Sequence, residues 1–125
     1  MGFFDSFKKK PEDKCVSFLK EADTHYSRAF QIKNAAGLDR YFERTCLSRL
    51  VERIRLSEKV YSGLDRYKHV TWRKVAEDTF IKEVRYDDVK ISKNVSAPVG
   101  DSYDEEWKVK LFNDTFKVVN LRRLA

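Results

Sequence analysis

The first third of the chain alternates apolar and polar residues with the spacing of an amphipathic helix. Apolar side chains recur every three or four residues from Cys15 to Phe30, which places them along one stripe of a helix. Pro11 suits the first helical turn, and the acidic pair that follows it suits the positive end of the helix dipole. The pattern predicts a helix from Pro11 to about Lys33.

A second helix is predicted after the sequence Asn-Ala-Ala-Gly at positions 34–37, and it runs from about Leu38 to Lys59. Its apolar row has i,i+4 spacing and consists of Phe42, Cys46, Leu50 and Ile54, beside Leu47 and Val51. Its arginines are expected mostly on the solvated side: Arg40, Arg44, Arg49, Arg53 and Arg55.

From Ser62 onward the chain is richer in Val, Ile, Thr, Trp and Tyr, which is typical of strands. Residues 64–77 fit either a short helix or a first strand. The apolar positions change parity across Asp87-Asp88, so we expect a turn or a bulge there. Residues 97–101 are predicted to be a loop because they contain Pro and Gly. The clearest hairpin has Asn113-Asp114 as its turn.

Helices followed by strands predict an α+β fold. We expect two N-terminal helices packed on a curved antiparallel sheet, in a cone-like single domain spanning residues 11–125. An aromatic and basic leader, residues 1–10, precedes it. At 125 residues the chain is long enough for one hydrophobic core.

Three stretches together carry a resemblance to a known family: the apolar face of the second helix, the strand Glu105-Glu106-Trp107-Lys108-Val109, and the last strand Phe116-Lys117-Val118-Val119. Over about residues 12–122 the chain resembles the nuclear transport factor two-like superfamily, and within it most resembles the mitochondrial translocase domain and its bacterial relatives. Enzymes of that superfamily, such as steroid isomerases and small hydratases, place an Asp or a His inside the cone. The resemblance therefore implies His25 or Asp39 as the candidate general base.

Charge and motif content exclude several functions. The net charge is +6, from 26 basic and 20 acidic residues, but acidic side chains interrupt the arginines of the second helix. A dense basic stripe, which nucleic-acid binding requires, is missing, so nucleic acid is not an expected partner. Stretches long enough for a membrane span or a signal peptide are also missing, and we expect a cytoplasmic protein, with a peripheral membrane location as the alternative.

Metal, cofactor and nucleophile motifs are missing as well. The two imidazoles, His25 and His69, have no zinc-site spacing, and the chain has neither a phosphate-binding glycine loop nor a nucleophile elbow. No metal, cofactor or catalytic residue is therefore assigned. Cys15 and Cys46 are expected to be buried free thiols. The acidic groups at 77–78, 87–88 and 104–106 are expected to be solvated charges at turns and edges.

The leader begins Met-Gly-Phe-Phe-Asp-Ser, which fits an N-myristoylation pattern, and a polybasic run at Lys8, Lys9 and Lys10 follows it. Without a lipid, the aromatic side chains of Phe3, Phe4 and Phe7 and the three lysines could contact an anionic membrane or an apolar groove of a partner. The alternative is a frayed or core-docked tail.

We therefore expect a non-enzymatic binding or assembly module, in which the curved sheet offers a pocket or a dimer face. Large aromatic residues supply contact area on such a surface, and the candidate ligand-binding residues are Trp72, Tyr103 and Trp107, with His25. The alternative for the three aromatic residues is packing in the core, and the alternative for His25 is a surface or groove position. The expected partner is another protein or a second copy of the chain, and a small apolar ligand is the alternative. Two other functions stay open: a small cone-fold enzyme acting by proton transfer on a small apolar molecule, and a membrane-surface adaptor tethered by the leader.

Overall fold

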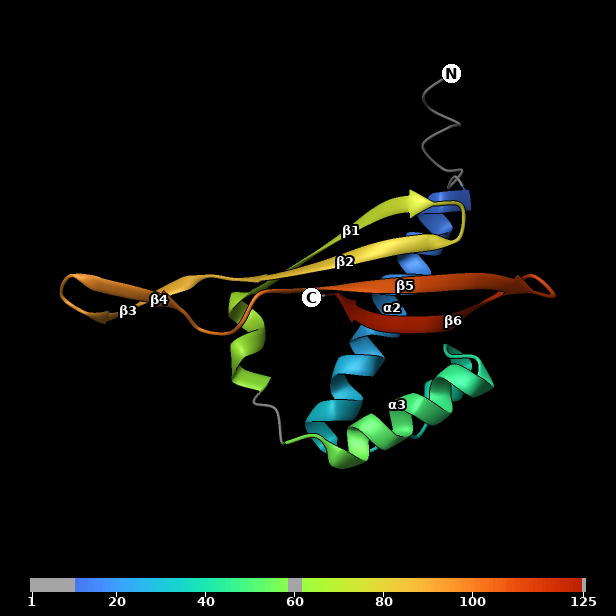
Figure 1. The fold of residues 1–125 in the computed structure, drawn as a ribbon, viewed down its shortest axis with the longest axis horizontal. Helices are drawn as coiled ribbons and strands as arrows, with labels where there is room; N and C mark the ends of the chain where they lie inside the picture. The colour runs from blue at the N-terminus through green and yellow to red at the C-terminus, as the bar shows by residue number, and fades with distance from the viewer. Residues whose placement is uncertain (1–10, 59–61, 125) are drawn as a thin grey trace, which may run out of the picture.

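Helices come first in the chain, and a curved antiparallel sheet follows them, so the predicted α+β class is confirmed (Figure 1). The computed structural model describes residues 11–58 and 62–124. The helical elements are α2 (Pro11–Ile32), the 3-10 helix η1 (Leu38–Arg40), α3 (Arg44–Leu56) and the 3-10 helix η2 (Ser62–Tyr67). The strands are β1 (Lys68–Ala76), β2 (Thr79–Tyr86), β3 (Asp88–Ser92), β4 (Val95–Pro98), β5 (Tyr103–Phe112) and β6 (Thr115–Leu124).

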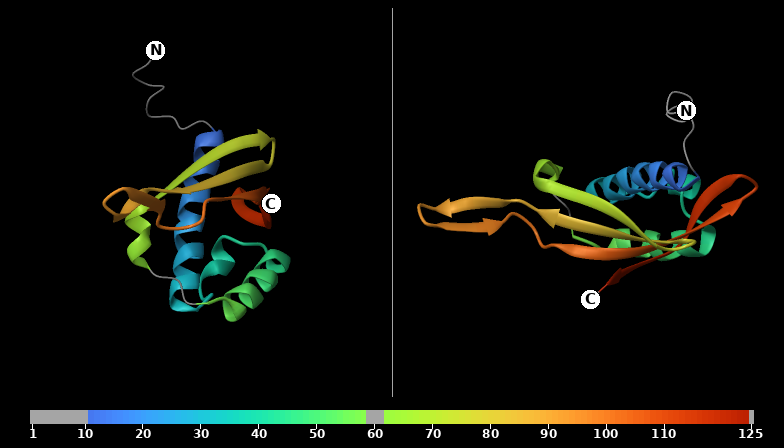
Figure 2. Two further views of the ribbon diagram at one scale, coloured as in Figure 1. Left: turned by 60° about the vertical axis from the view of Figure 1, so that its left-hand side comes forward. Right: turned by 90° about the horizontal axis from the view of Figure 1, so that it is seen from above.

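The main sheet has the strand order β1-β2-β5-β6, and each neighbouring pair is antiparallel. Strands β3 and β4 form a separate two-stranded sheet, which projects from the body as an arm (Figure 1). Helix α2 crosses one face of the main sheet, and α3 lies beside β6 (Figures 1 and 2). The helices therefore cover one face of the sheet and leave the other to solvent.

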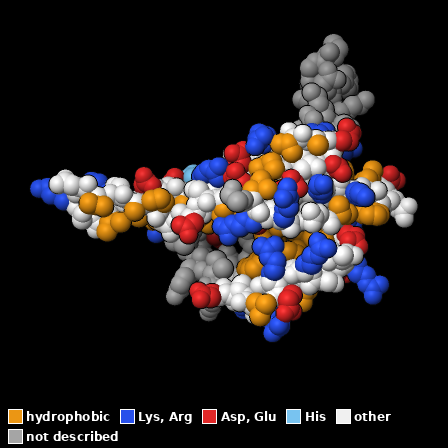
Figure 3. All heavy atoms as spheres, viewed as in Figure 1, with side chains coloured by type: hydrophobic (Ala, Val, Ile, Leu, Met, Phe, Trp, Pro, Cys, Tyr) orange, Lys and Arg blue, Asp and Glu red, His pale blue; other side chains and the backbone are white. Residues whose placement is uncertain are grey.

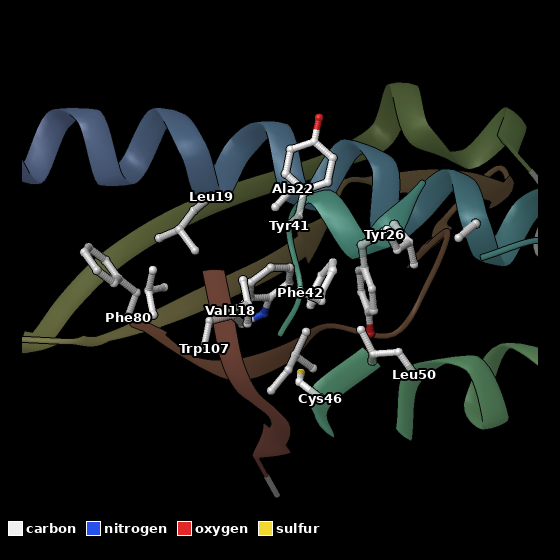
Figure 4. Packing of buried hydrophobic residues seen from close by; sticks show 14 of the residues in the cluster. Leu19, Ala22, Tyr26, Tyr41, Phe42, Cys46, Leu50, Phe80, Trp107 and Val118 are labelled. Carbon is white, nitrogen blue, oxygen red and sulfur yellow. The ribbon is translucent and has the colours of Figure 1, made fainter. Parts of the chain in front are cut away.

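The core lies between α2, α3 and the covered face of the sheet (Figure 4). Trp107 of β5 is fully buried, and its ring centroid lies 5.5 Å from that of Tyr26 on α2 and 5.7 Å from that of Phe42. Edge-to-face and tilted ring pairs of this kind add to the stabilisation from buried area. The stripe predicted from the spacing of helix α2 supplies Cys15, Leu19, Ala22, Tyr26 and Ala29 to this core.

The second helix differs from its prediction, because the continuous helix expected from Leu38 is interrupted before Arg44. Here the backbone leaves the helix to pair with β6: the Glu43 amide donates to the Val118 carbonyl at 2.9 Å, and the Val118 amide donates to the Tyr41 carbonyl at 2.8 Å. The Glu43 side chain then caps α3 by accepting from the Thr45 amide at 3.1 Å. Phe42, predicted as a helical position, is buried in the core from this linker instead.

The structure shows the conformation of two stretches for which the sequence left alternatives. Residues 64–77 contain both elements that the pattern allowed, because η2 ends at Tyr67 and β1 begins at Lys68. The parity change at Asp87-Asp88 marks the point where the chain leaves the main sheet and enters the arm. The loop predicted at 97–101 begins later, since β4 extends to Pro98. A proline is tolerated there because both strands of a two-stranded arm are edge strands.

The hairpin turn at Asn113-Asp114 is confirmed. Both residues adopt left-handed backbone conformations, with φ of 47° at Asn113 and 66° at Asp114, as the two central residues of a type I′ turn require. This turn joins β5 to β6.

The two cysteines are buried free thiols, as expected. Burial raises the pKa of both Cys15 and Cys46, that of Cys46 to about 11.

Candidate functional site

A buried lysine lies at the centre of the candidate site. Lys82 occupies β2 between Phe80 and Val84, and its side chain has no exposed surface. Its Nζ donates to Asp23 Oδ1 on α2 at 2.6 Å and to Glu105 Oε1 on β5 at 3.2 Å. A buried charge is tolerated when it is paired and hydrogen-bonded in this way.

Two further donors complete the environment of Glu105. The Tyr26 hydroxyl donates to Oε2 at 3.2 Å, and the Trp107 indole N–H donates to Oε1 at 3.4 Å. Every buried side-chain nitrogen or oxygen of the described residues has a hydrogen-bond partner. Lys82, Asp23, Glu105 and Tyr26, called the Lys82 cluster below, therefore form one satisfied network across α2, β2 and β5.

Lys82 and Tyr26 keep their protons at neutral pH. Burial by itself lowers the pKa of Lys82, but the charges of Asp23 and Glu105 more than compensate, and the pKa is raised above its usual value. Burial, together with the Glu105 charge, raises the pKa of Tyr26 well above that of free tyrosine. Lys82 is thus a cation and Tyr26 a neutral hydroxyl donor.

A pocket opens next to this cluster, between α2, η2, α3 and the end of the sheet where the arm begins. Its volume is about 240 Å³. Buried Glu105 and Tyr26 form its floor. We call it the Tyr103 pocket, and its lining residues are Tyr26, Ser27, Phe30, Gln31, Arg53, Asp65, Lys68, Tyr86, Tyr103, Glu105 and Arg123.

Three cations line the Tyr103 pocket, each from a different element: Arg53 on α3, Lys68 on β1 and Arg123 on β6. The Arg123 guanidinium carbon lies 4.1 Å from the Tyr103 ring centroid, a cation–π contact that holds it against the pocket wall. Burial, with a smaller effect of the Lys82 charge, lowers the pKa of Lys68. None of the three forms an ion pair with a carboxylate among the described residues.

The two acidic residues of the pocket, by contrast, already have partners. Glu105 is paired with Lys82, and Asp65 accepts a hydrogen bond from Gln31 Nε2 at 2.9 Å. Since the Lys82 charge offsets that of Glu105, the pocket lining presents an excess of positive charge to an incoming ligand.

The sequence-predicted binding residues are distributed over three places. Tyr103 lines the pocket. Trp107 is fully buried beneath it, and Trp72 packs edge-on against Trp107 with ring centroids 5.2 Å apart. His25 is exposed and stacks on the Tyr41 ring at 4.9 Å, away from the pocket lining. The leader residues Phe3, Phe4, Phe7, Lys8, Lys9 and Lys10 lie outside the described residues.

Sequence reasoning missed the charged residues of the site, and one expectation was wrong. Glu105 was expected to be solvated with its acidic neighbours, but it is 2% exposed. It shares strand parity with the aromatic residues Tyr103 and Trp107, and that parity was the signal for an inward position. Similar signals existed for the other two charged residues. Lys82 has the same strand parity as the buried residues Phe80 and Val84, and Asp23 lies three residues before Tyr26 on the buried stripe of α2.

The opposite face of the sheet carries cross-strand ion pairs. Arg73 pairs with Glu83 at 3.5 Å, Arg85 with Asp104 at 2.8 Å, and Arg122 with Glu106 at 3.0 Å. Charged pairs on such a face remain solvated and contribute little to stability. The sheet face best suited to a ligand is therefore the one that the helices cover.

Comparison with known proteins returned no significant match among family models, curated proteins or solved structures. The resemblance to the nuclear transport factor two-like superfamily stays a prediction. Within the described residues, no group of three His, Cys, Asp or Glu side chains is placed to hold a metal ion. Among the described helices, none combines the length and apolar character that a membrane crossing requires.

Proposed function

We propose that the chain is a non-enzymatic binding module and that the Tyr103 pocket holds its ligand. The observation that carries this proposal is the bonding of the pocket floor. Both Glu105 oxygens accept hydrogen bonds from protein donors, and Lys82 is buried and protonated. A fully satisfied network of this kind rigidifies a site, and it leaves no free base at the floor to exchange a proton with a substrate.

The walls of the pocket favour a ligand with a flat apolar body. Tyr86, Tyr103 and Phe30 all line it, and aromatic side chains give contact area with defined geometry. The volume of about 240 Å³ lies just below the roughly 300–1,000 Å³ range of pockets for drug-sized molecules. A ligand of one or two fused rings fits this size.

A proton-transfer enzyme is less well supported by the arrangement. A general base has to lie within hydrogen-bond distance of the proton that it removes. His25 is exposed beside Tyr41, and Asp39 lines a different groove, beside Phe42. Neither residue lines the Tyr103 pocket, so neither could serve a substrate bound there.

Assembly with a protein partner is a second candidate function, favoured by the β3–β4 arm. Ile91 is 68% exposed and Val95 is 53% exposed on this arm, and Figure 3 shows apolar side chains along it. Sedimentation velocity should then show a partner complex or a dimer that is lost in the double variant Ile91→Ser, Val95→Ser. A sedimentation coefficient that is the same in both proteins would contradict assembly through the arm.

The binding function is tested by filling the pocket. Ligand-observed NMR with a library of small aromatic molecules should detect binders of the wild-type protein. Ser27→Trp places a ring in the pocket from the lining of α2, and binding should be lost. Lys20→Trp adds the same ring at an exposed position of the same helix, and binding should be kept. Binding that survives Ser27→Trp, or a library without binders, would contradict the proposal.

A further inference from the structure

The three cations of the Tyr103 pocket have no ion-pair partner among the described residues. Arg53, Lys68 and Arg123 come from α3, β1 and β6, yet all line one cavity of about 240 Å³. On the outer face of the same sheet, by contrast, Arg73, Arg85 and Arg122 are each paired with a carboxylate. The chain thus pairs its outer arginines and leaves the pocket cations available.

The carboxylates in the pocket balance only part of the charge of the three cations, since the Lys82 charge offsets that of Glu105 and Asp65 supplies a single negative charge. Glu105 is engaged by Lys82, Tyr26 and Trp107, and Asp65 is engaged by Gln31. Lys68 is half-buried, and this burial lowers its pKa. An anion that enters the pocket would therefore meet one partly desolvated cation, Lys68, beside the exposed guanidinium groups of Arg53 and Arg123. Its attraction to Lys68 is stronger than it would be in open water.

We infer that the Tyr103 pocket takes a small organic anion: a flat apolar ring system between Tyr86, Tyr103 and Phe30, with a carboxylate at Arg53, Lys68 and Arg123. This inference rests on the proposed binding function. It adds the charge of the ligand, which the aromatic walls alone do not determine. Arg53 and Arg123 each offer a planar fork of donors that matches a carboxylate, and Lys68 offers a point charge.

The test uses three probes of the same shape and different charge: 1-naphthoate, 1-naphthamide and 1-naphthylmethylammonium. Isothermal titration of the full chain at pH 7 should give a Kd for 1-naphthoate at least about tenfold below that for the amide, with the ammonium weakest. Raising the salt concentration should weaken 1-naphthoate binding and leave amide binding nearly unchanged. Acetate, which lacks the rings, should bind more weakly than 1-naphthoate.

Variants connect the charge preference to the pocket. Arg53→Gln, Lys68→Gln and Arg123→Gln should each weaken 1-naphthoate binding by about three- to tenfold, the range expected for one partly exposed charge. Amide binding should change less than twofold. Arg49→Gln, one turn before Arg53 on the exposed surface of α3, and Arg122→Gln, the neighbour of Arg123 paired on the outer face, are matched controls. They should leave the affinity for 1-naphthoate unchanged.

The possible outcomes distinguish a failure of the anion preference from a failure of the proposed binding function. Equal or tighter binding of the amide or the ammonium, lost in Ser27→Trp, would overturn the anion preference and leave the binding function standing. Binding of 1-naphthoate that the control variants reduce as much as the pocket variants would also overturn it. If none of the probes binds, or if all bind Ser27→Trp undiminished, both the inference and the proposed function are contradicted.

Discussion

The Nζ atom of Lys82 lies 2.6 Å from Oδ1 of Asp23, and this contact ties the second strand of the sheet to the long helix α2. The same Nζ reaches Glu105 on the neighbouring strand at 3.2 Å. It also lies 5.4 Å from the Tyr26 ring centroid and 5.6 Å from that of Trp107. One cation therefore holds together three elements that surround the pocket floor.

Removal of this cation should be strongly destabilising. Lys82→Met keeps an unbranched side chain as far as Cε but removes the ammonium group, and so leaves Asp23 and Glu105 buried without their counter-charge. Loss of one partner from a buried ion pair costs about 3–5 kcal/mol, and we expect a loss of that size in the free energy of unfolding measured with urea. Lys108→Met, at an exposed position of β5, is the control and should change stability by less than about 0.5 kcal/mol.

A compensated variant separates charge from packing. The triple variant Lys82→Met, Asp23→Asn, Glu105→Gln removes all three charges and should regain part of the stability lost in Lys82→Met, since neutral groups are less costly to bury than charges. If the single variant unfolds at the wild-type urea concentration, the cluster does not stabilise the fold as described.

Tyr26→Phe should weaken the same network by a smaller amount. The substitution keeps the ring that packs on Trp107 and Phe42 and removes only the hydroxyl that donates to Glu105 Oε2 at 3.2 Å. Hydrogen bonds to charged groups contribute about 1.5–3 kcal/mol, and urea unfolding should show a loss in that range. Tyr67→Phe, in η2 outside this network, is the control. A loss no larger than that of Tyr67→Phe would contradict the hydrogen bond.

Stability should decline in alkaline solution. The pKa values of Lys82 and Tyr26 are raised in the folded chain, so above about pH 10 the unfolded chain releases these protons while the folded chain retains them. The unfolded state then binds fewer protons, and the free energy of unfolding falls as pH rises. The stabilisation is fully present below the unfolded pKa values.

The measurement is urea unfolding at intervals from pH 7 to pH 11.5. The decline should be less steep in Tyr26→Phe, which no longer contributes a tyrosine proton. A flat profile up to pH 11.5 would contradict the raised pKa values. Cys46, whose pKa burial raises to about 11, contributes in the same direction, and Cys46→Ser in parallel measures its share.

The parts of the fold that were predictable rest on local spacing. The stripe from Cys15 to Ala29 and the turn at Asn113-Asp114 are set by residues close together in the chain. The break before α3 was not predictable in this way, because it depends on backbone hydrogen bonds between Glu43 and Val118. Nothing in the helical spacing of residues 38–59 reports on a strand 75 residues away.

The pocket was predictable only through one of its residues, Tyr103. Trp107 was expected to contact a ligand for the same reason as Tyr103, since large aromatic side chains supply contact area, but it is buried in the core. Glu105 was expected to be solvated, and Lys82 and Asp23 were not singled out, because a buried charge is rare unless it is paired. Their pairing joins residues 59 and 23 positions apart, and periodicity carries no information on such contacts.

Gly100 lies against a wall of the pocket. A Cβ at this position would meet three ring atoms of Tyr86 at 3.1 Å, and Tyr86 lines the Tyr103 pocket. Gly100→Ala should therefore push the Tyr86 ring into the pocket by a few tenths of an ångström. Overpacking of this kind costs about 1 kcal/mol in folding stability. Because the displaced ring narrows the pocket, we also expect the Kd for 1-naphthoate to rise by roughly two- to fivefold. Asp101→Ala, at the exposed next residue, is the control. Tyr86 ring signals that shift in NMR spectra without any change in Kd would show that ligand does not contact this wall.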